Sequence, residues 1–315
     1  MVYGEPVDWK LSIAGLFIGV LVGMTGMGGG SLMTPMLVFL FGFKPTVAIG
    51  TDILHGAIFK SFGAMRHRQL GTVHARLTLW MLLGSAPFSL VGVGLSTWLK
   101  HRYGDGFEDT AAIILGIALI AGGLGFAVKT FLTGREKSDA PFVLRTSDRR
   151  IAFFLGVAGG FVVGLTSVGS GTFFGLVMLL VFPLTASKVV GTDIFHAAAL
   201  LWVAGAGHLV AGNVDLNATA WLLVGSIPGV LLGSQVSINL PELALRLGLA
   251  TTLTLAGLKL AEVPGAEVVI LVVLSAAALA LIAVGVRKLL GKTVRDSAKP
   301  VPAEAVAGTT RTAGR

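Results

Sequence analysis

The chain contains one stretch twice, and this duplication is the strongest constraint on its fold. Each copy has a glycine-rich segment followed by a Gly-Thr-Asp segment: GMTGMGGGS (23–31) with IGTDILH (49–55), then GLTSVGSGT (164–172) with VGTDIFH (190–196). When residues 23–92 are aligned without a gap to 164–233, 22 of the 70 positions are identical. Agreement over this length predicts two structurally equivalent halves.

Composition places both halves in a membrane. Of the 315 residues, 54% are hydrophobic and 13% are charged, and the mean hydropathy is +0.86, whereas a soluble domain is about 25% charged. Such a chain cannot cover its surface with polar side chains. Long runs of Leu, Val, Ala and Gly without strict alternation favour helices over a barrel. We therefore expect an all-α, multi-pass protein of the cell (inner or plasma) membrane.

The lengths of the apolar segments indicate broken helices. In each half the first two segments have about 15 and 12 residues, whereas about 20 are needed to cross the hydrocarbon core. We expect each pair to form a hairpin around its glycine turn, followed by about three transmembrane helices; such paired short segments point to a transporter's binding site. The expected parts are a polar N-terminal lead (1–10), a first membrane repeat (11–131), a cytoplasmic connection (132–150), a second membrane repeat (151–261), an extra C-terminal transmembrane helix (262–286) and a basic, disordered cytoplasmic tail (287–315).

Loop charge predicts that the two repeats are inverted relative to each other. The connection 66–76 carries three arginines, whereas its equivalent, 207–217, carries neither Lys nor Arg. Basic residues collect on the cytoplasmic side of helical membrane proteins, so equivalent loops should lie on opposite sides. Following the chain from there places the N-terminus and loop 99–110 outside, and the C-terminus in the cytoplasm. The net charge of +8 is thus a topology signal, and no nucleic-acid partner is expected.

The two glycine turns are suited to an anion. Glycines let the backbone turn sharply, a Ser or Thr can cap the following helix, and unpaired amides at a helix start attract negative charge. The alternative is that these glycines only allow close helix packing. The predicted substrate-binding residues are Thr25, Gly28, Gly29, Gly30, Ser31, Thr51, Thr166, Gly169, Ser170, Gly171, Thr172 and Thr192.

Two Asp/His pairs lie in apolar segments downstream of the turns. Asp52 with His55, and Asp193 with His196, each share a helix face at a spacing of three residues. A carboxylate inside the membrane costs several kcal/mol unless it is paired or hydrated, so it is functional by default. Each Asp could accept a coupling proton, bind a cation, or hold the neighbouring His or backbone. We predict proton coupling for all four residues.

Three further polar residues have open roles. Lys60 has Leu201 at the equivalent position, and we expect it to extend to the inner surface, as long basic side chains do in membranes. His67 and His208 match across the repeats and border loops. A gate, a structural corner and a ligand are all compatible with them.

Several of these motifs resemble the TauE/SafE sulfite exporter family of permeases. The similar residues are 23–35, 48–51, His67, Gly71 and Val73 in the first half, and 164–172, Gly191, Thr192, His208 and 212–215 in the second. The resemblance covers about 11–286 and implies a duplicated helical permease for small sulfur-containing anions such as sulfite, thiosulfate and sulfonates. The second turn departs from the family pattern, because Ser170 interrupts its glycines and Leu176 replaces the proline.

Together these features predict a secondary transporter, an exporter of a small sulfur-containing oxyanion coupled to protons. The expected partners are that anion and the lipid bilayer, with a homodimer as a candidate state; no cofactor is expected. Absent cysteine excludes thiolate sites and Cys nucleophiles, and there is no nucleophile elbow, P-loop lysine or metalloprotease pair, so no enzyme is expected. The alternatives are a divalent-metal permease using the Asp/His pairs and a non-transporting membrane assembly protein.

Overall fold

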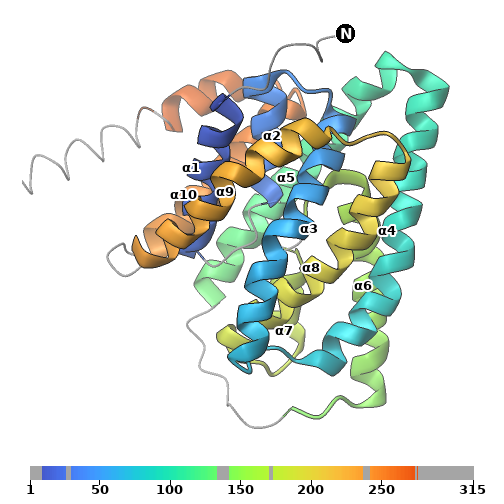
Figure 1. Ribbon diagram of the computed structural model, residues 1–315, viewed down its shortest axis with the longest axis vertical. Coiled ribbons are helices and arrows are strands. Elements are labelled where there is room, and N and C mark those ends of the chain that lie inside the picture. The colour runs from blue at the N-terminus through green and yellow to red at the C-terminus, as the bar shows by residue number, and fades with distance from the viewer. Residues whose placement is uncertain are drawn as a thin grey trace, which may run out of the picture. The chain divides into compact units, whose positions relative to one another are not determined.

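The computed structural model describes residues 9–25, 30–132, 142–169, 173–236, 242–273 and 275, and the structural statements below concern these. They are helical, without strands (Figure 1). Residues up to Pro264 form one compact unit; in a second unit, 266–273 are helical. The helices of the first unit are α1 (Trp9–Thr25), α2 (Gly30–Phe41), α3 (Pro45–Gln69), α4 (Ala75–Tyr103), α5 (Asp105–Leu132), α6 (Thr146–Thr166), α7 (Phe173–Val181), α8 (Ala186–Val210), α9 (Leu216–Val236) and α10 (Glu242–Leu260).

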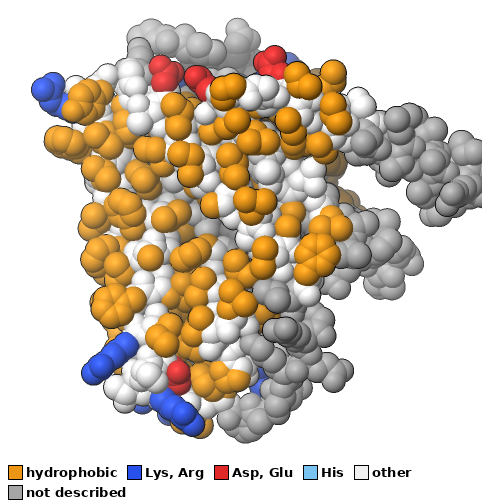
Figure 2. Space-filling model, turned by 180° about the vertical axis from the view of Figure 1, so that it is seen from behind, with side chains coloured by type: hydrophobic (Ala, Val, Ile, Leu, Met, Phe, Trp, Pro, Cys, Tyr) orange, Lys and Arg blue, Asp and Glu red, His pale blue; other side chains and the backbone are white. Residues whose placement is uncertain are grey.

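The helix surfaces fit a membrane, as the composition predicts. Four segments are long and apolar enough to cross one: Ala75–Tyr103, Gly106–Gly125, Thr146–Thr166 and Ser187–Val210. Large apolar side chains such as Phe17, Leu40 and Phe131 are more than 60% exposed, which only lipid makes favourable. Figure 2 shows apolar side chains over the middle of one face and charged side chains at its two ends. The predicted polytopic all-helical fold is confirmed.

The two repeats interlock instead of forming separate bundles. The main helix contacts pair α1 with α9, α4 with α6, α3 with α8, and α5 with α10, so each pair takes one helix from each repeat. Glycines allow the close approach: a Cβ on Gly84 would meet the carbonyl oxygen of Phe153, and one on the equivalent Gly225 would meet that of Ser12. Small residues at helix contacts serve this purpose in membranes.

The central helices α3 and α8 run in opposite directions. The loop after α3 packs near the start of α8, since a Cβ on Gly191 would meet Thr72. The loop after α8 packs near the start of α3, since a Cβ on Gly50 would meet the carbonyl oxygen of Asn213. Figure 1 shows α3 descending and α8 ascending. The repeats are therefore antiparallel at the centre, as the loop charges predict.

Several helices are longer than the hydropathy pattern predicts. The predicted loop 99–110 is mostly helical, because α4 ends at Tyr103 and α5 begins at Asp105. The first arm of the second hairpin, α6, has 21 residues and begins at Thr146, five residues before the expected apolar segment. Its first turn consists of polar residues, and the Asp148 carboxylate accepts a hydrogen bond from the backbone N–H of Arg145, the N-cap, at 2.8 Å. A capped polar turn extends a helix without adding hydropathy. Most of the predicted segment 267–286 lies outside the described residues.

Candidate functional site

The polar centre of the molecule lies on α3 and α8, which carry the two Gly-Thr-Asp segments. The side chains of Asp52, His55 and Lys60 on α3, and of Asp193 and His196 on α8, are each at most 4% exposed. The other helices shield them from lipid, which explains how α3 can run through the middle of the unit although it carries charged side chains along its length. Five ionisable side chains at the centre of an apolar bundle mark a functional region.

Both Gly-Thr pairs dock a loop of the opposite repeat. The Thr51 hydroxyl accepts a hydrogen bond from the backbone N–H of Asp215 at 3.0 Å, and the Thr192 hydroxyl accepts one from that of His74 at 2.9 Å. The docked residues in turn cap α9 and α4: the Asp215 carboxylate accepts from the N–H of Ala218, and His74 Nδ1 accepts from that of Leu77. Thr51 and Thr192 thus have a structural role; their predicted substrate contact is untested.

We expect Thr51→Val to lower the free energy of unfolding by about 1 kcal/mol, because it leaves a partly buried backbone N–H without its acceptor. Thr192→Val should have an equal effect. The measurement is thermal unfolding of the detergent-solubilised protein, with Thr110→Val, at an exposed position on α5, as the matched control. A loss of anion affinity at unchanged stability would instead assign these hydroxyls to the substrate.

Each central histidine binds a serine of the other repeat. His55 Nε2 and Ser226 Oγ are hydrogen-bonded at 2.8 Å, and His196 Nε2 and Ser85 Oγ at 2.9 Å. Ser85 and Ser226 occupy equivalent positions, two residues before a proline inside α4 and α9. The Phe174 ring packs edge-on against the His196 ring, with centroids 4.5 Å apart. The two histidines therefore connect the central helices to the proline-containing helices of the opposite repeat.

The carboxylate of Asp52 connects the two hairpins. Its Oδ2 accepts hydrogen bonds from Thr34 Oγ1 at 2.5 Å and from Ser167 Oγ at 2.7 Å. Thr34 lies in the first turn of α2, just after the first glycine turn, and Ser167 begins the second turn in a left-handed conformation (φ 63°). The buried Oδ1 has no hydrogen-bond partner among the described residues. Segments more than 130 residues apart thus meet at one carboxylate.

Asp193 has a different environment although the repeat makes it the equivalent of Asp52. The positions equivalent to Thr34 and Ser167 are Gly175 and Gly26, which have no hydroxyl to offer. The two carboxylates therefore differ in their surroundings, because the hydroxyls of Thr34 and Ser167 that bind Asp52 have no counterparts at the equivalent positions around Asp193.

Lys60 lies inside the protein, and the prediction that it extends to the inner surface is wrong. Its side chain is only 3% exposed, and its charge interacts electrostatically with Asp193 and, more weakly, with Asp52. The two buried carboxylates hold the ammonium in the interior, since each charge is costly there without an opposite one. The position of Lys60 midway along a helix, with Leu201 as its equivalent, is the signal that marks it as functional.

The structure describes only part of the two glycine turns that are predicted to bind an anion. Gly28, Gly29, Ser170, Gly171 and Thr172 lie outside the described residues, as do the side chains of Thr25 and Ser31 at the ends of α1 and α2 and the surroundings of Gly30. In the second turn Gly169 has φ 138°, and its carbonyl oxygen accepts hydrogen bonds from the first two amides of α7. Those two amides are engaged within the turn; contact of the turns with substrate is untested.

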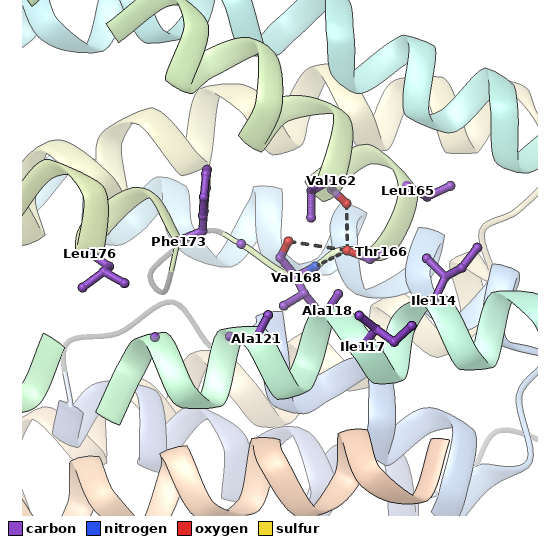
Figure 3. Close-up of a pocket in the computed structure, with 13 residues that line it drawn as sticks. Ile114, Ile117, Ala118, Ala121, Val162, Leu165, Thr166, Val168, Phe173 and Leu176 are labelled. Atoms are coloured by element: carbon purple, nitrogen blue, oxygen red, sulfur yellow. Dashed lines mark hydrogen bonds between the residues drawn. The ribbon is translucent and has the colours of Figure 1, made fainter. Parts of the chain in front are cut away.

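Thr166 lines an apolar cavity beside the second turn. Its hydroxyl donates to the Val162 carbonyl at 2.7 Å and accepts from the Val168 N–H at 3.2 Å. Figure 3 shows these bonds at the edge of a cavity of about 390 Å³ between α5, α6 and α7, which Ile117, Phe173 and other apolar side chains line. Among the described residues the lining of this cavity offers no free polar group for an anion. The bonds of Thr166 give it a structural role, and its predicted substrate contact is untested.

The two histidines at the loop ends, His67 and His208, also form hydrogen bonds. His208 is fully buried, and its Nε2 is hydrogen-bonded to the Gly164 carbonyl at 2.9 Å, where the second glycine segment begins. His67 Nδ1 bonds the Thr72 hydroxyl at 3.0 Å. These contacts favour a structural role at a loop corner over ligand binding for both histidines. In the part of the chain that is described, no three His, Asp or Glu side chains are placed to hold a metal, so the geometry gives the metal-permease alternative no support.

Comparison with known proteins places the chain in a family. The family model described as "Sulfite exporter TauE/SafE" matches residues 11–260. "Probable membrane transporter protein YjnA" of Bacillus subtilis (strain 168) is 36% identical over 252 residues, which cover 80% of this chain and 98% of the relative. "Probable membrane transporter protein YdhB" of the same organism is 25% identical over 247 residues, covering 77% and 96%. No solved structure matches the chain.

Proposed function

Because the chain belongs to the sulfite exporter TauE/SafE family and is a membrane transporter rather than an enzyme, we propose that it carries a small sulfur-containing oxyanion together with a proton. Sulfite, thiosulfate and an organosulfonate are the candidate substrates, and export is the proposed direction. The resemblance stated from the motifs is confirmed as family membership; the substrate, the proton and the direction are the proposal.

The observation that carries the proposal is the meeting of both hairpins at Asp52. Thr34 and Ser167 flank the two glycine turns and donate to the same carboxylate oxygen. Protonation of Asp52 removes the charge that both hydroxyls stabilise, so it changes the attachment of both hairpins at once. A proton here is therefore able to bias the position of one hairpin against the other, which is the movement that alternating access needs.

The central charges support an anion as the substrate. With Asp52 and Asp193 ionised and Lys60 charged, the three groups sum to a net charge of −1, which repels an anion. One proton makes the set neutral, and a second makes it positive. Proton binding and anion binding should therefore strengthen each other, and the coupling is reciprocal. The two would cross the membrane together.

Co-transport fixes the sign of the expected pH effect. Anion efflux should accelerate when the compartment that holds the anion is more acidic than the other, because the proton then moves in the same direction. A gradient of one pH unit is worth about 1.4 kcal/mol per proton, which is a tenfold difference in anion concentration at equilibrium. Proton antiport would give the opposite sign.

The test is flux of sulfite and thiosulfate from proteoliposomes, with the pH gradient inside-acid, absent and inside-alkaline. We expect efflux to be fastest with an acidic interior, and chloride-loaded vesicles serve as the control for anion selectivity. Absence of flux for sulfite, thiosulfate and a short sulfonate under all three gradients would contradict the proposed substrate class. It would favour the alternative of an assembly protein, which predicts no flux and a stable partner on purification.

A further inference from the structure

A second cavity, with polar groups in its lining, lies at the C-terminal end of α4. It has a volume of about 370 Å³ and is formed by the end of α4, the start of α5, the residue before α3 and the loop after α8. Lys44, Lys100 and His101 contribute the basic groups of its lining, and Glu108 contributes the acidic one. The loops around it are those that the charge pattern assigns to the outside.

The carboxylate in this cavity is committed to the fold. Glu108 is 7% exposed, and its two oxygens accept hydrogen bonds from the Thr46 backbone N–H at 3.1 Å and from the Thr46 hydroxyl at 2.6 Å. It therefore caps the start of α3, where a negative charge is favourable. Because both oxygens accept hydrogen bonds from Thr46, the carboxylate has a structural role at the start of α3.

The ammonium of Lys100 is oriented by a neutral partner. It donates to Asn213 Oδ1 at 2.9 Å, and Asn213 is itself buried, with its Nδ2 donating to Thr97 Oγ1 at 3.1 Å. An amide fixes the position of the ammonium without neutralising it. None of the described residues forms an ion pair with Lys100, so it retains donors and a full charge for a ligand.

The second repeat has no cation at the position equivalent to Lys44, where Thr185 stands. Basic residues are also disfavoured on the outer side of membrane proteins, to which the loop charges assign this end. A ligand explains basic groups in a cavity at an end of the molecule where the topology disfavours them.

The cavity is connected to the polar centre through the docked loop. The backbone carbonyl of Asn213 lies against Gly50 on α3, and the loop N–H of Asp215 binds the Thr51 hydroxyl. Asp52 is the next residue along the helix. A ligand at Lys100 and Asn213 therefore lies against the loop that packs on the coupling segment.

We propose that this cavity is a peripheral anion-binding site in which Lys44, Lys100 and His101 hold a small oxyanion at one mouth of the transport pathway. That the bound oxyanion is the transported one rests on the proposed function. The site concentrates the anion next to the docked loop and gives the two ends of the pathway different affinities.

The first experiment is transport kinetics of thiosulfate from each side of oriented proteoliposomes. Lys44→Gln/Lys100→Gln should raise KM about tenfold on the side of the cavity only, with the maximal rate within about twofold. The matched control is Arg102→Gln, a cation on the exposed end of α4 outside the cavity lining, which should leave both values unchanged. Lys44→Gln/His101→Gln, which keeps the Lys100–Asn213 bond, replaces the first variant if that one does not fold. Unchanged KM on both sides in a folded double variant would overturn the proposal.

A binding measurement separates failure of this inference from failure of the proposed function. Thiosulfate-dependent thermal stabilisation in detergent should persist in Asp52→Asn, and in the cavity variant it should require about tenfold more thiosulfate. If thiosulfate is not transported but shows this pattern, the cavity is an anion site and thiosulfate is not the transported substrate. If the stabilisation requires no more thiosulfate in the cavity variant and is lost in Asp52→Asn, thiosulfate binds only at the centre and the peripheral site is rejected.

Discussion

Asp52→Asn is expected to abolish the acceleration of anion efflux by an acidic interior. The amide cannot take up the coupling proton, so efflux under a gradient should fall to the rate without a gradient, and one pH unit should no longer sustain a concentration ratio of about tenfold at equilibrium. The carboxamide oxygen can still accept from Thr34 and Ser167. The hairpins should therefore remain attached, and exchange of labelled for unlabelled anion across vesicles without a gradient should persist.

The matched control is Asp215→Asn, because Asp215 is an acid outside the centre whose role as the cap of α9 an asparagine can take over. Its efflux should keep the full gradient effect. Asp193→Asn should weaken the effect less than Asp52→Asn does, since the hydroxyls of Thr34 and Ser167 that link Asp52 to both hairpins are replaced by glycine at the equivalent positions, Gly175 and Gly26. A gradient effect that survives in Asp52→Asn/Asp193→Asn would remove both carboxylates from the coupling.

Local properties of the sequence predict most of the fold. Hydropathy depends on neighbouring residues only, and it predicts an apolar segment at 46–65 where α3 forms. Loop charge predicts the antiparallel arrangement, because basic loops collect on one side of a membrane and the equivalent loops of the two repeats differ in charge. The prediction misses the first turn of α6, whose polar residues are helical by virtue of capping. The burial of Asp52 and His55 is predictable as well, because their helical flanks are apolar.

The partners of the buried groups are harder to predict, because they depend on which helices pack together. Ser85 and Ser226 are ordinary small residues, and their bonds to His196 and His55 exist only because α4 and α9 each lie against the central helix of the other repeat. One signal does point to them: serine occupies this position in both halves, and each serine stands two residues before a matched proline. Ser167 offers no such signal, since glycine replaces it in the first turn.

Lys60→Met should destabilise the protein more than any other substitution of a single charged residue at the centre. Removing one member of a buried charge set leaves its partners uncompensated, at a cost of about 3–5 kcal/mol. At about 2 °C per kcal/mol for a chain of this size, the midpoint of thermal unfolding in detergent should fall by about 6–10 °C. Lys10→Met, at an exposed position near the start of α1, should change it by less than about 1 °C.

The charge explanation, unlike a packing explanation, predicts a rescue. Leu201 occupies the equivalent position in the second repeat, so an apolar side chain of this size is compatible with the helix geometry. Adding Asp193→Asn to Lys60→Met removes the carboxylate with the stronger electrostatic interaction, and it should restore at least half of the lost stability. A double variant no more stable than Lys60→Met would show that the cost arises from packing. If the rescued protein folds but no longer transports anion, Lys60 contributes its charge to the substrate as well as to the two carboxylates.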